Sequence, residues 1–241
     1  MTSVDRLLAA APHPSPFNAN LIIASRDPVS IAVPVLGRPN VAIIGAGPLR
    51  SEAPLSDTNW EVWGLNAVPV VDAEGRFRAD RWFEMHQHHA QSADDLRWIR
   101  ACPVPLYVPD DLLMAETPRA VRYPLAHIEE TLGAYWACTF AYQIALAIDT
   151  GFERIGLYGV ELMFGDERER TVELACVSWW LGFAEGKGID IALPDRSPLC
   201  RHPARYGIEY DEEKALVAKY VEQRRIADQV RADMQLGGLG G

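Results

Sequence analysis

The sequence predicts an α/β protein built as a single Rossmann-like domain, with an open, mostly parallel sheet and helices on both faces. Short apolar runs alternate with helical stretches between residues 41 and 200. This alternation is typical of a parallel sheet, because a helix carries the chain back between neighbouring strands. The first run, Val41 to Ile44, breaks directly into the glycine turn GAGP. A strand that ends in such a turn is a common start of a nucleotide-binding sheet.

The composition is typical of one folded cytoplasmic domain. The chain has 241 residues, is 49% hydrophobic and carries a formal net charge of −10. This charge disfavours general binding to nucleic-acid backbones or anionic membranes. No apolar run is long enough to span a bilayer and no signal-type segment opens the chain, so we expect a soluble cytoplasmic protein without a membrane span. The four cysteines are widely spaced, which predicts free thiols rather than a zinc site or disulfides.

Three segments follow from the distribution of residues. Residues 1–40 form a proline-rich N-terminal arm that we expect to be partly irregular. Residues 41–205 form the nucleotide-binding domain. Residues 206–241 contain a charged helix over 211–235 and a glycine-rich tail that we expect to be flexible. One side of this terminal helix is apolar, which offers a surface for a homo-oligomer.

The remaining elements are predicted from runs and periods. Strands are expected at 61–66, 81–86, 106–109, 154–159 and 189–194. Apolar residues at helical spacing predict helices at 93–100, 133–150 and 168–185, and Gly151 is suited to end the second of them. Thr139 has two interpretations. It opens this second helix, where its hydroxyl and the free amides could meet an anion, or it is an interior packing residue.

Polar and glycine residues follow most of these strands, where ligands bind in an open parallel sheet. The candidates are Gly45, Ala46, Gly47 and Pro48 after the first strand, Asn66 after the second, Glu84 and His86 after the third, Asp110 and Asp111 after the fourth, and Gly159 and Glu161 after the fifth. Glycine lets the backbone approach a phosphate closely. The amide of Asn66 both donates and accepts, so it suits a ribose or base edge, although asparagine also suits a turn.

His86 is the candidate for acid–base chemistry. Strand alternation places Glu84 and His86 on one face, so Glu84 could orient His86 as a general base or a metal ligand. Equally, the HQHH stretch could be a solvated loop.

An acidic pair and a tryptophan pair are weaker candidates for ligand binding. Asp110 and Asp111 could hold magnesium beside a phosphate or stay solvated. Trp179 and Trp180 are expected to pack within a helix rather than stack on a base.

Five short motifs follow one another along the chain. They are Gly45-Ala46-Gly47-Pro48-Leu49, Asn66, the stretch from Cys138-Thr139 to Gly151, Gly159-Val160-Glu161, and Ser197 between Pro194 and Leu199. In this order they resemble the small bacterial sialyltransferases that use a cytidine-monophosphate sugar donor, and related Rossmann-like proteins of the pterin diphosphokinase-like kind. Uncharacterised phage proteins are similar in motif order. The resemblance implies a nucleotide-sugar donor held by the glycine turn, Asn66, Thr139, Gly159 and Ser197.

The sequence departs from this family where catalysis would occur. The sialyltransferases carry a catalytic histidine between the fourth motif and the last strand, whereas residues 162–187 here contain none. His86 is therefore the first candidate base, followed by Glu161 and Glu173. The predicted function is a nucleotide or nucleotide-sugar binding enzyme, a glycosyltransferase-like group transferase with an unidentified acceptor. Helix termini could stabilise the leaving phosphate, so no cofactor or metal is required, while an added divalent metal stays open.

Two alternatives remain at this point. The first is an oxidoreductase that binds NAD(P) or FAD, but Arg50 stands where the dinucleotide fingerprint needs a third glycine or alanine. The second is a catalytically silent nucleotide-binding protein that keeps the pocket without the base.

Overall fold

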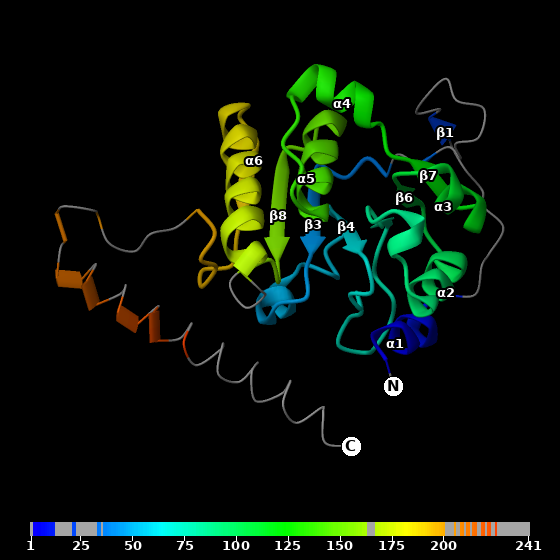
Figure 1. Ribbon diagram of the computed structural model, residues 1–241, viewed down its shortest axis with the longest axis horizontal. Coiled ribbons are helices and arrows are strands. Elements are labelled where there is room, and N and C mark those ends of the chain that lie inside the picture. Colours follow the sequence, from blue (N-terminus) through cyan, green and yellow to red (C-terminus); the bar gives the residue numbers. More distant parts are fainter. Residues whose placement is uncertain are drawn as a thin grey trace. The chain divides into compact units, whose positions relative to one another are not determined.

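The computed structural model describes residues 2–12, 21–22, 33–34, 36–162 and 167–200, with single positions and pairs between 205 and 225. The chain divides into two compact units, Met1–Ser197 and Pro198–Gly241. The first unit contains a seven-stranded sheet in which every neighbouring pair of strands is parallel. The predicted open α/β fold is thereby confirmed (Figure 1).

The strand order of the sheet is β7-β6-β5-β4-β3-β8-β9. Its members are β3 (Asn40–Ile44), β4 (Trp60–Leu65), β5 (Arg81–Phe83), β6 (Leu106–Val108), β7 (Ala120–Arg122), β8 (Arg154–Tyr158) and β9 (Asp190–Ala192). The chain first winds outward from β3 to β7 and then returns to place β8 beside β3. The strand order therefore reverses between β3 and β8, and ligands bind at such a switch point in sheets of this type.

All five strands predicted after the first end earlier than expected, and three of these differences matter for the site. The strand predicted to reach residue 66 ends at Leu65, because Asn66 has a φ of 47°, which a strand cannot contain. The strand predicted to reach residue 86 ends at Phe83, which leaves Glu84 and His86 in a loop. The strand predicted to reach residue 159 ends one residue earlier, and Gly159 has a φ of 74°. The three-residue strand β7 was not predicted, since it is too short to show a period.

Helices cover both faces of the sheet. On β3, Ala42 and Ile44 belong to a core cluster with Val4, Leu7 and Trp98 from helices α1 (Ser3–Ala10) and α2 (Ala93–Ala101). Val41 and Ile43 point to the other face because side chains alternate along a strand, and they are fully buried as well. Helix α5 (Thr139–Thr150) packs against β3, and α4 (Leu125–Leu132) packs against α5.

The helix predicted over 133–150 begins only at residue 139, and a separate helix that was not predicted, α4, precedes it. Helix α4 ends at Gly133, which has a φ of 100°, and α5 begins at Thr139 after Cys138. A residue with such a φ ends a helix, and this backbone is accessible mainly to glycine. Gly151 ends α5 in the left-handed conformation, as predicted. The structure thus decides between the two interpretations of Thr139, which lies at the start of a helix.

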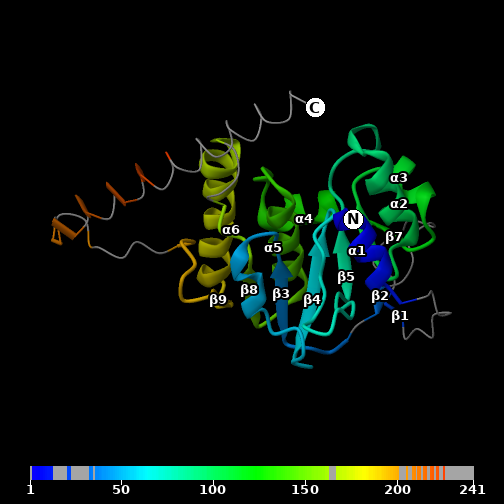
Figure 2. The same cartoon turned by 90° about the horizontal axis from the view of Figure 1, so that it is seen from below.

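The bounds of the other helices agree in part with the bounds predicted from the sequence. Helix α2 and helix α6 (Leu174–Gly186) lie within or beside their predicted ranges, and a π-helical turn, η3 (Glu169–Glu173), precedes α6. Helix α3 (Asp111–Glu116), the turns η1 (Pro48–Glu52) and η2 (His88–Ala90), and helices α1 and α4 were not predicted. Figure 2 shows α6 and α5 beside β9, β8 and β3.

The N-terminal arm contains a helix that the sequence analysis missed. Thr2 and Asp5 form a capping box at the start of α1, and Arg97 of α2 donates to Asp5 at 2.9 Å. The spacing of Thr2 and Asp5 was the available signal. Two short strands, β1 (Leu21–Ile22) and β2 (Val33–Pro34), form an antiparallel pair, and most of the remaining arm lies outside the described residues.

The second unit can be described only in part. The described positions from Asp211 to Arg225 are helical, in agreement with the predicted terminal helix, and Arg225 pairs with Glu222 at 2.8 Å. The glycine-rich tail lies outside the described residues. None of the helices in the described part of the chain combines the length and apolar character needed to cross a bilayer.

Candidate functional site

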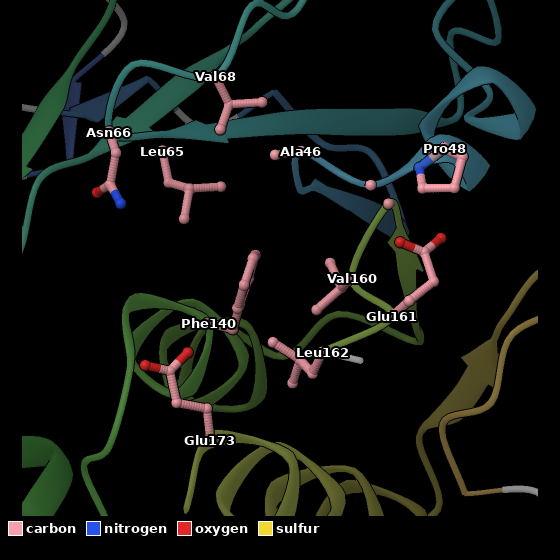
Figure 3. A pocket seen from close by; sticks show the side chains of 12 residues that line it. Ala46, Pro48, Leu65, Asn66, Val68, Phe140, Val160, Glu161, Leu162 and Glu173 are labelled. Carbon is pink, nitrogen blue, oxygen red and sulfur yellow. The ribbon is translucent and has the colours of Figure 1, made fainter. Parts of the chain in front are cut away.

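Two neighbouring cavities lie at the carboxyl ends of the strands, at the switch point between β3 and β8. The glycine-loop cavity has a volume of about 530 Å³ and is lined by Ala46, Gly47, Pro48, Leu65, Asn66, Val68, Phe140, Gly159, Val160, Glu161, Leu162 and Glu173 (Figure 3). The helix-start cavity has a volume of about 470 Å³ and is lined by Leu65, Asn66, Met85, His86, Trp136, Ala137, Cys138, Thr139, Phe140, Tyr142, Arg168 and Glu173. Four residues line both, so the cavities adjoin along Leu65, Asn66, Phe140 and Glu173.

The glycine loop after β3 is held against the end of β8. The amide of Gly45 donates to the Tyr158 carbonyl at 2.8 Å, and that of Gly47 donates to the Gly159 carbonyl at 2.8 Å. A Cβ on Gly45 would lie 2.2 Å from the Gly159 carbonyl oxygen. The two glycines are therefore required by the close packing of two strand ends. Their amides, expected to hold a phosphate, are already used within the protein.

Glu161 completes this contact and occupies the space in front of the loop. Its Oε1 accepts a hydrogen bond from the Leu49 amide at 3.1 Å, and the residue is only 5% exposed. A Cβ on Gly47 would lie 1.6 Å from Oε2 of Glu161. This Oε2 is buried and has no hydrogen-bond partner. Figure 3 shows the carboxyl group beside Pro48 at the edge of the cavity.

Asn66 lies at the boundary of the two cavities on a tightly fixed backbone. Its amide donates to the Phe83 carbonyl at 3.0 Å, and its carbonyl accepts from Nε1 of Trp82 at 3.0 Å. The left-handed backbone is one that asparagine tolerates better than most residues. Its Oδ1 is buried without a partner. The side chain extends from the end of β4 toward the cavity (Figure 3), with hydrogen-bonding capacity that the protein does not use.

His86 lines the helix-start cavity and forms the expected pair with Glu84. Nδ1 of His86 lies 2.6 Å from Oε1 of Glu84, which also accepts from the His86 amide at 3.2 Å. Glu84 is 3% exposed, whereas the His86 side chain is 58% exposed. The hydrogen bond that His86 donates to Glu84 raises the pKa of His86, although partial burial opposes this. A buried carboxylate that fixes one ring nitrogen of an accessible histidine leaves the other nitrogen for proton transfer.

The start of α5 forms another wall of the helix-start cavity. Thr139 is the first residue of the helix and is 7% exposed, and Phe140 next to it lines both cavities. The free amides of a helix start favour an anion. Burial raises the pKa of the Cys138 thiol to about 12, so it is neutral at pH 7 and a poor nucleophile. Arg168 enters the same cavity and pairs with Glu173.

The other predicted site residues have different environments. Gly159 lines the glycine-loop cavity, and a Cβ there would lie 2.8 Å from Cβ of Arg50. Ser197 is 6% exposed but is not among the residues that line either cavity. The role of each predicted site residue in ligand binding stays a prediction.

The acidic pair after β6 is used within the protein. Asp110 caps α3 through the Leu113 amide at 2.9 Å and accepts from the His88 amide at 3.0 Å. Asp111 pairs with Arg122. Within the described part of the chain, no group of three or more histidine, cysteine, aspartate or glutamate side chains is arranged to hold a metal.

Aromatic packing agrees with the expectation for Trp180. It is fully buried and donates from Nε1 to the Tyr135 carbonyl at 2.7 Å, whereas Trp179 is 42% exposed.

Sequence reasoning missed Phe140, Arg168 and Gln143. Gln143 is fully buried in α5 and donates from Nε2 to the Gly64 carbonyl of β4 at 3.2 Å, so it fixes the helix start against the strand end. A polar residue within an otherwise apolar helix was the available signal. Phe140 and Arg168 gave none, because their place in the cavities depends on how α5 and η3 pack.

The fold and the site define an open α/β protein with two adjoining cavities at the switch point of a parallel sheet. No protein-family model and no curated protein matches the sequence. Among solved structures, the chain is similar to the sialyltransferase CstII from Campylobacter jejuni in complex with a substrate analogue, cytidine-5′-monophosphate. The two are 17% identical over 66% of this chain and 81% of that chain, with a TM-score of 0.44.

A second similar structure is the sialyltransferase CST-II in complex with a trisaccharide acceptor and CMP, at 16% identity. The similarity covers 67% of this chain and 81% of that chain, with a TM-score of 0.42. Such distant similarity carries no argument about the reaction, so the function is argued from the site.

Proposed function

We propose that the protein binds a nucleotide or nucleotide sugar across the two cavities and transfers a sugar or a related group from it, as a glycosyltransferase-like enzyme. The observation that carries this proposal is the side chain of Asn66. It lies at the boundary of both cavities at the switch point, its backbone is fixed by hydrogen bonds, and its Oδ1 is buried without a partner. A buried polar atom without a partner is costly unless a ligand supplies one.

The size and chemistry of the groove support a nucleotide-type ligand. The volumes of about 530 and 470 Å³ are within the range of small-molecule pockets. An asparagine amide can read a base or ribose edge, and the ring of Phe140 offers an apolar surface beside it. The order of the five sequence motifs favours a nucleotide-sugar donor. The start of α5 at Thr139 supports a phosphate there, because the free amides of a helix start favour an anion.

The chemistry follows from the Glu84–His86 pair. Neutral His86 would take the proton from a hydroxyl group of the acceptor substrate. At the same time the oxygen of that hydroxyl would form a bond to the transferred carbon. The bond from that carbon to the donor phosphate oxygen breaks, and the phosphate leaves with the electron pair. The start of α5 would stabilise the leaving phosphate. Because Glu84 raises the pKa of His86, the base form increases only as the pH rises through that raised value.

A binding panel tests this proposal. Thermal unfolding is measured with the 5′-monophosphates of cytidine, uridine, adenosine, guanosine and thymidine, and with NAD. We expect at least one monophosphate to raise the melting temperature. The Asn66→Gly variant keeps a favourable backbone and should bind that ligand at least about tenfold more weakly, as expected for a lost buried hydrogen bond. Asn59→Gly in an exposed turn is the control and should bind normally.

The panel has clear adverse outcomes. No shift with any nucleotide would exclude the nucleotide site. Normal binding by Asn66→Gly would remove Asn66 from it. Binding without turnover of any nucleotide sugar would favour a silent nucleotide-binding protein. The arrangement of Glu161 in front of the glycine loop disfavours the dinucleotide alternative, because a pyrophosphate would meet a carboxylate there. Roles for Ser197 and self-association through the terminal helix remain predictions.

A further inference from the structure

The two cavities differ in the charge of the residues that line them. The glycine-loop cavity is lined by Glu161 and Glu173, and no basic side chain is among its described lining residues. The helix-start cavity contains His86 and Arg168 as well as Glu173, and it includes the start of α5. Phosphate groups are bound by basic side chains and free backbone amides. The helix-start cavity therefore has the groups that a phosphate needs, and the glycine-loop cavity does not.

Glu161 determines what the glycine loop can accept. The amides of Gly45, Gly47 and Leu49 are all bonded within the protein, the last of them to Oε1 of Glu161. Oε2 is buried, has no partner and stands where a Cβ on Gly47 would lie. An ionised carboxylate offers only acceptor atoms. A ligand group that satisfies this oxygen must donate a hydrogen bond, and a phosphate placed there would meet a like charge.

We propose that Glu161 makes the glycine-loop cavity selective for a hydrogen-bond donor of the ligand, a hydroxyl or an amine, and excludes phosphate from it. The inference rests on the proposed function for the identity of the whole ligand, and it orients that ligand. Its uncharged or cationic donor end lies against Glu161, and its phosphate lies toward His86 and Thr139. The glycine turn thus acts as a packing element between β3 and β8 rather than as a phosphate cradle.

The variant Glu161→Gln tests the inference, because glutamine keeps an oxygen for the Leu49 amide and replaces the acceptor Oε2 by a donor. Affinities are measured by calorimetry for inorganic pyrophosphate, cytidine and CMP. We expect the affinity of Glu161→Gln for pyrophosphate to rise by roughly tenfold, since like charges across an interface suppress binding. Cytidine binding should weaken, because its donor groups lose their acceptor. Glu52→Gln on the neighbouring turn η1 controls for general charge and should leave both affinities unchanged.

Each outcome separates this inference from the proposed function. Unchanged pyrophosphate affinity in Glu161→Gln overturns the inference, whether or not nucleotides bind. Increased pyrophosphate affinity supports it even if the wild-type protein binds neither cytidine nor CMP, a result that would count against the nucleotide proposal. Glu161→Asp keeps the charge and is the second variant should Glu161→Gln not fold. It should still exclude pyrophosphate, and tight pyrophosphate binding by Glu161→Asp would overturn the inference.

Discussion

Glu61 and Glu161 are similarly buried but have very different hydrogen-bond partners. Glu61 lies at the amino end of the sheet and Glu161 beyond its carboxyl end. Glu61, near the start of β4, is 2% exposed and receives hydrogen bonds from Nε1 of Trp63 at 2.8 Å and from Nη2 of Arg81 at 3.1 Å. Nε of Arg81 adds an ion-pair contact of 2.8 Å. Glu161, beyond the end of β8, is 5% exposed and receives one hydrogen bond, from Leu49.

The difference is between a carboxylate with both oxygens paired and one with an oxygen that has no partner. Both oxygens of Glu61 are paired, and Arg81 is further held by the Tyr107 hydroxyl at 3.1 Å. Glu161 keeps one buried oxygen without a partner. Folded proteins rarely leave buried polar atoms unpaired. An unpaired atom of this kind calls for an explanation, such as a functional role or a bound water or ion. The carboxylate near the amino end of the sheet is thus fully paired within the protein, while the one beyond its carboxyl end keeps an unpaired acceptor oxygen.

The largest effect is expected for Glu61→Gln. Removing the charge opposite Arg81 leaves a buried guanidinium uncompensated, so the free energy of unfolding should fall by about 3 kcal/mol. Urea unfolding measures this loss. The double variant Glu61→Leu with Arg81→Met should recover much of it, because no charge is then buried. A loss below about 1 kcal/mol for the single variant would show that the pair is not structural.

The next largest effect is expected for Gly45→Ala, which tests the packing of the glycine loop against β8. The new methyl group would press on the Gly159 carbonyl, so we expect a loss of about 2–3 kcal/mol in urea unfolding. Gly182→Ala in α6 is the matched control, because a Cβ there meets nothing within 4 Å. It should raise the stability by about 0.5–1 kcal/mol. An equal change in unfolding free energy in the two variants would contradict the tight contact between Gly45 and the Gly159 carbonyl.

A smaller effect of opposite sign is expected for Glu161→Gln. Replacing a buried carboxylate that has one unpaired oxygen relieves the cost of burying its charge, so the unfolding free energy should rise by up to about 1 kcal/mol. The same substitution therefore destabilises at residue 61 and stabilises at residue 161. A loss as large as that of Glu61→Gln would mean that Glu161 is structural too.

The smallest effect concerns the Glu84–His86 pair and depends on pH. The hydrogen bond that His86 donates to Glu84 raises the pKa of His86 in the folded protein. A raised folded pKa contributes stability that is fully present below the unfolded value near 6.5 and is lost as the pH rises through the folded value. We therefore expect the stability advantage of wild type over His86→Ala to be larger at pH 5.5 than at pH 9. This change with pH should be less than about 1 kcal/mol, because the ring is half exposed.

An NMR titration of His86 checks the cause of this pH dependence. In the Glu84→Gln variant, the pKa of His86 should fall toward its ordinary value, since the charged partner is gone. An unchanged titration in that variant would show that another group raises it.

The predictable part of the fold was encoded in local patterns. Apolar runs identified β3, β4 and β8, because strands buried on both faces need uninterrupted aliphatic and aromatic residues. Short elements such as β7 and α3 were not predicted, since three to six residues are too few to show a period. The true start of α5 was missed because the apolar pattern continues through residues 133–138, which join α4 to α5 without forming a helix.

The sequence by itself determined the parallel α/β fold and the glycine turn after β3, because these depend on local burial patterns. The pairing of Glu84 with His86 was suggested by strand alternation, but a loop after β5 makes it. Only the tertiary structure decided how the glycine loop is used. The bond from Leu49 to Glu161 joins residues 112 positions apart, and no local pattern records it. Parallel pairing of β3 with β8 brings them together, and it converts an expected phosphate loop into a packed turn that faces a buried carboxylate.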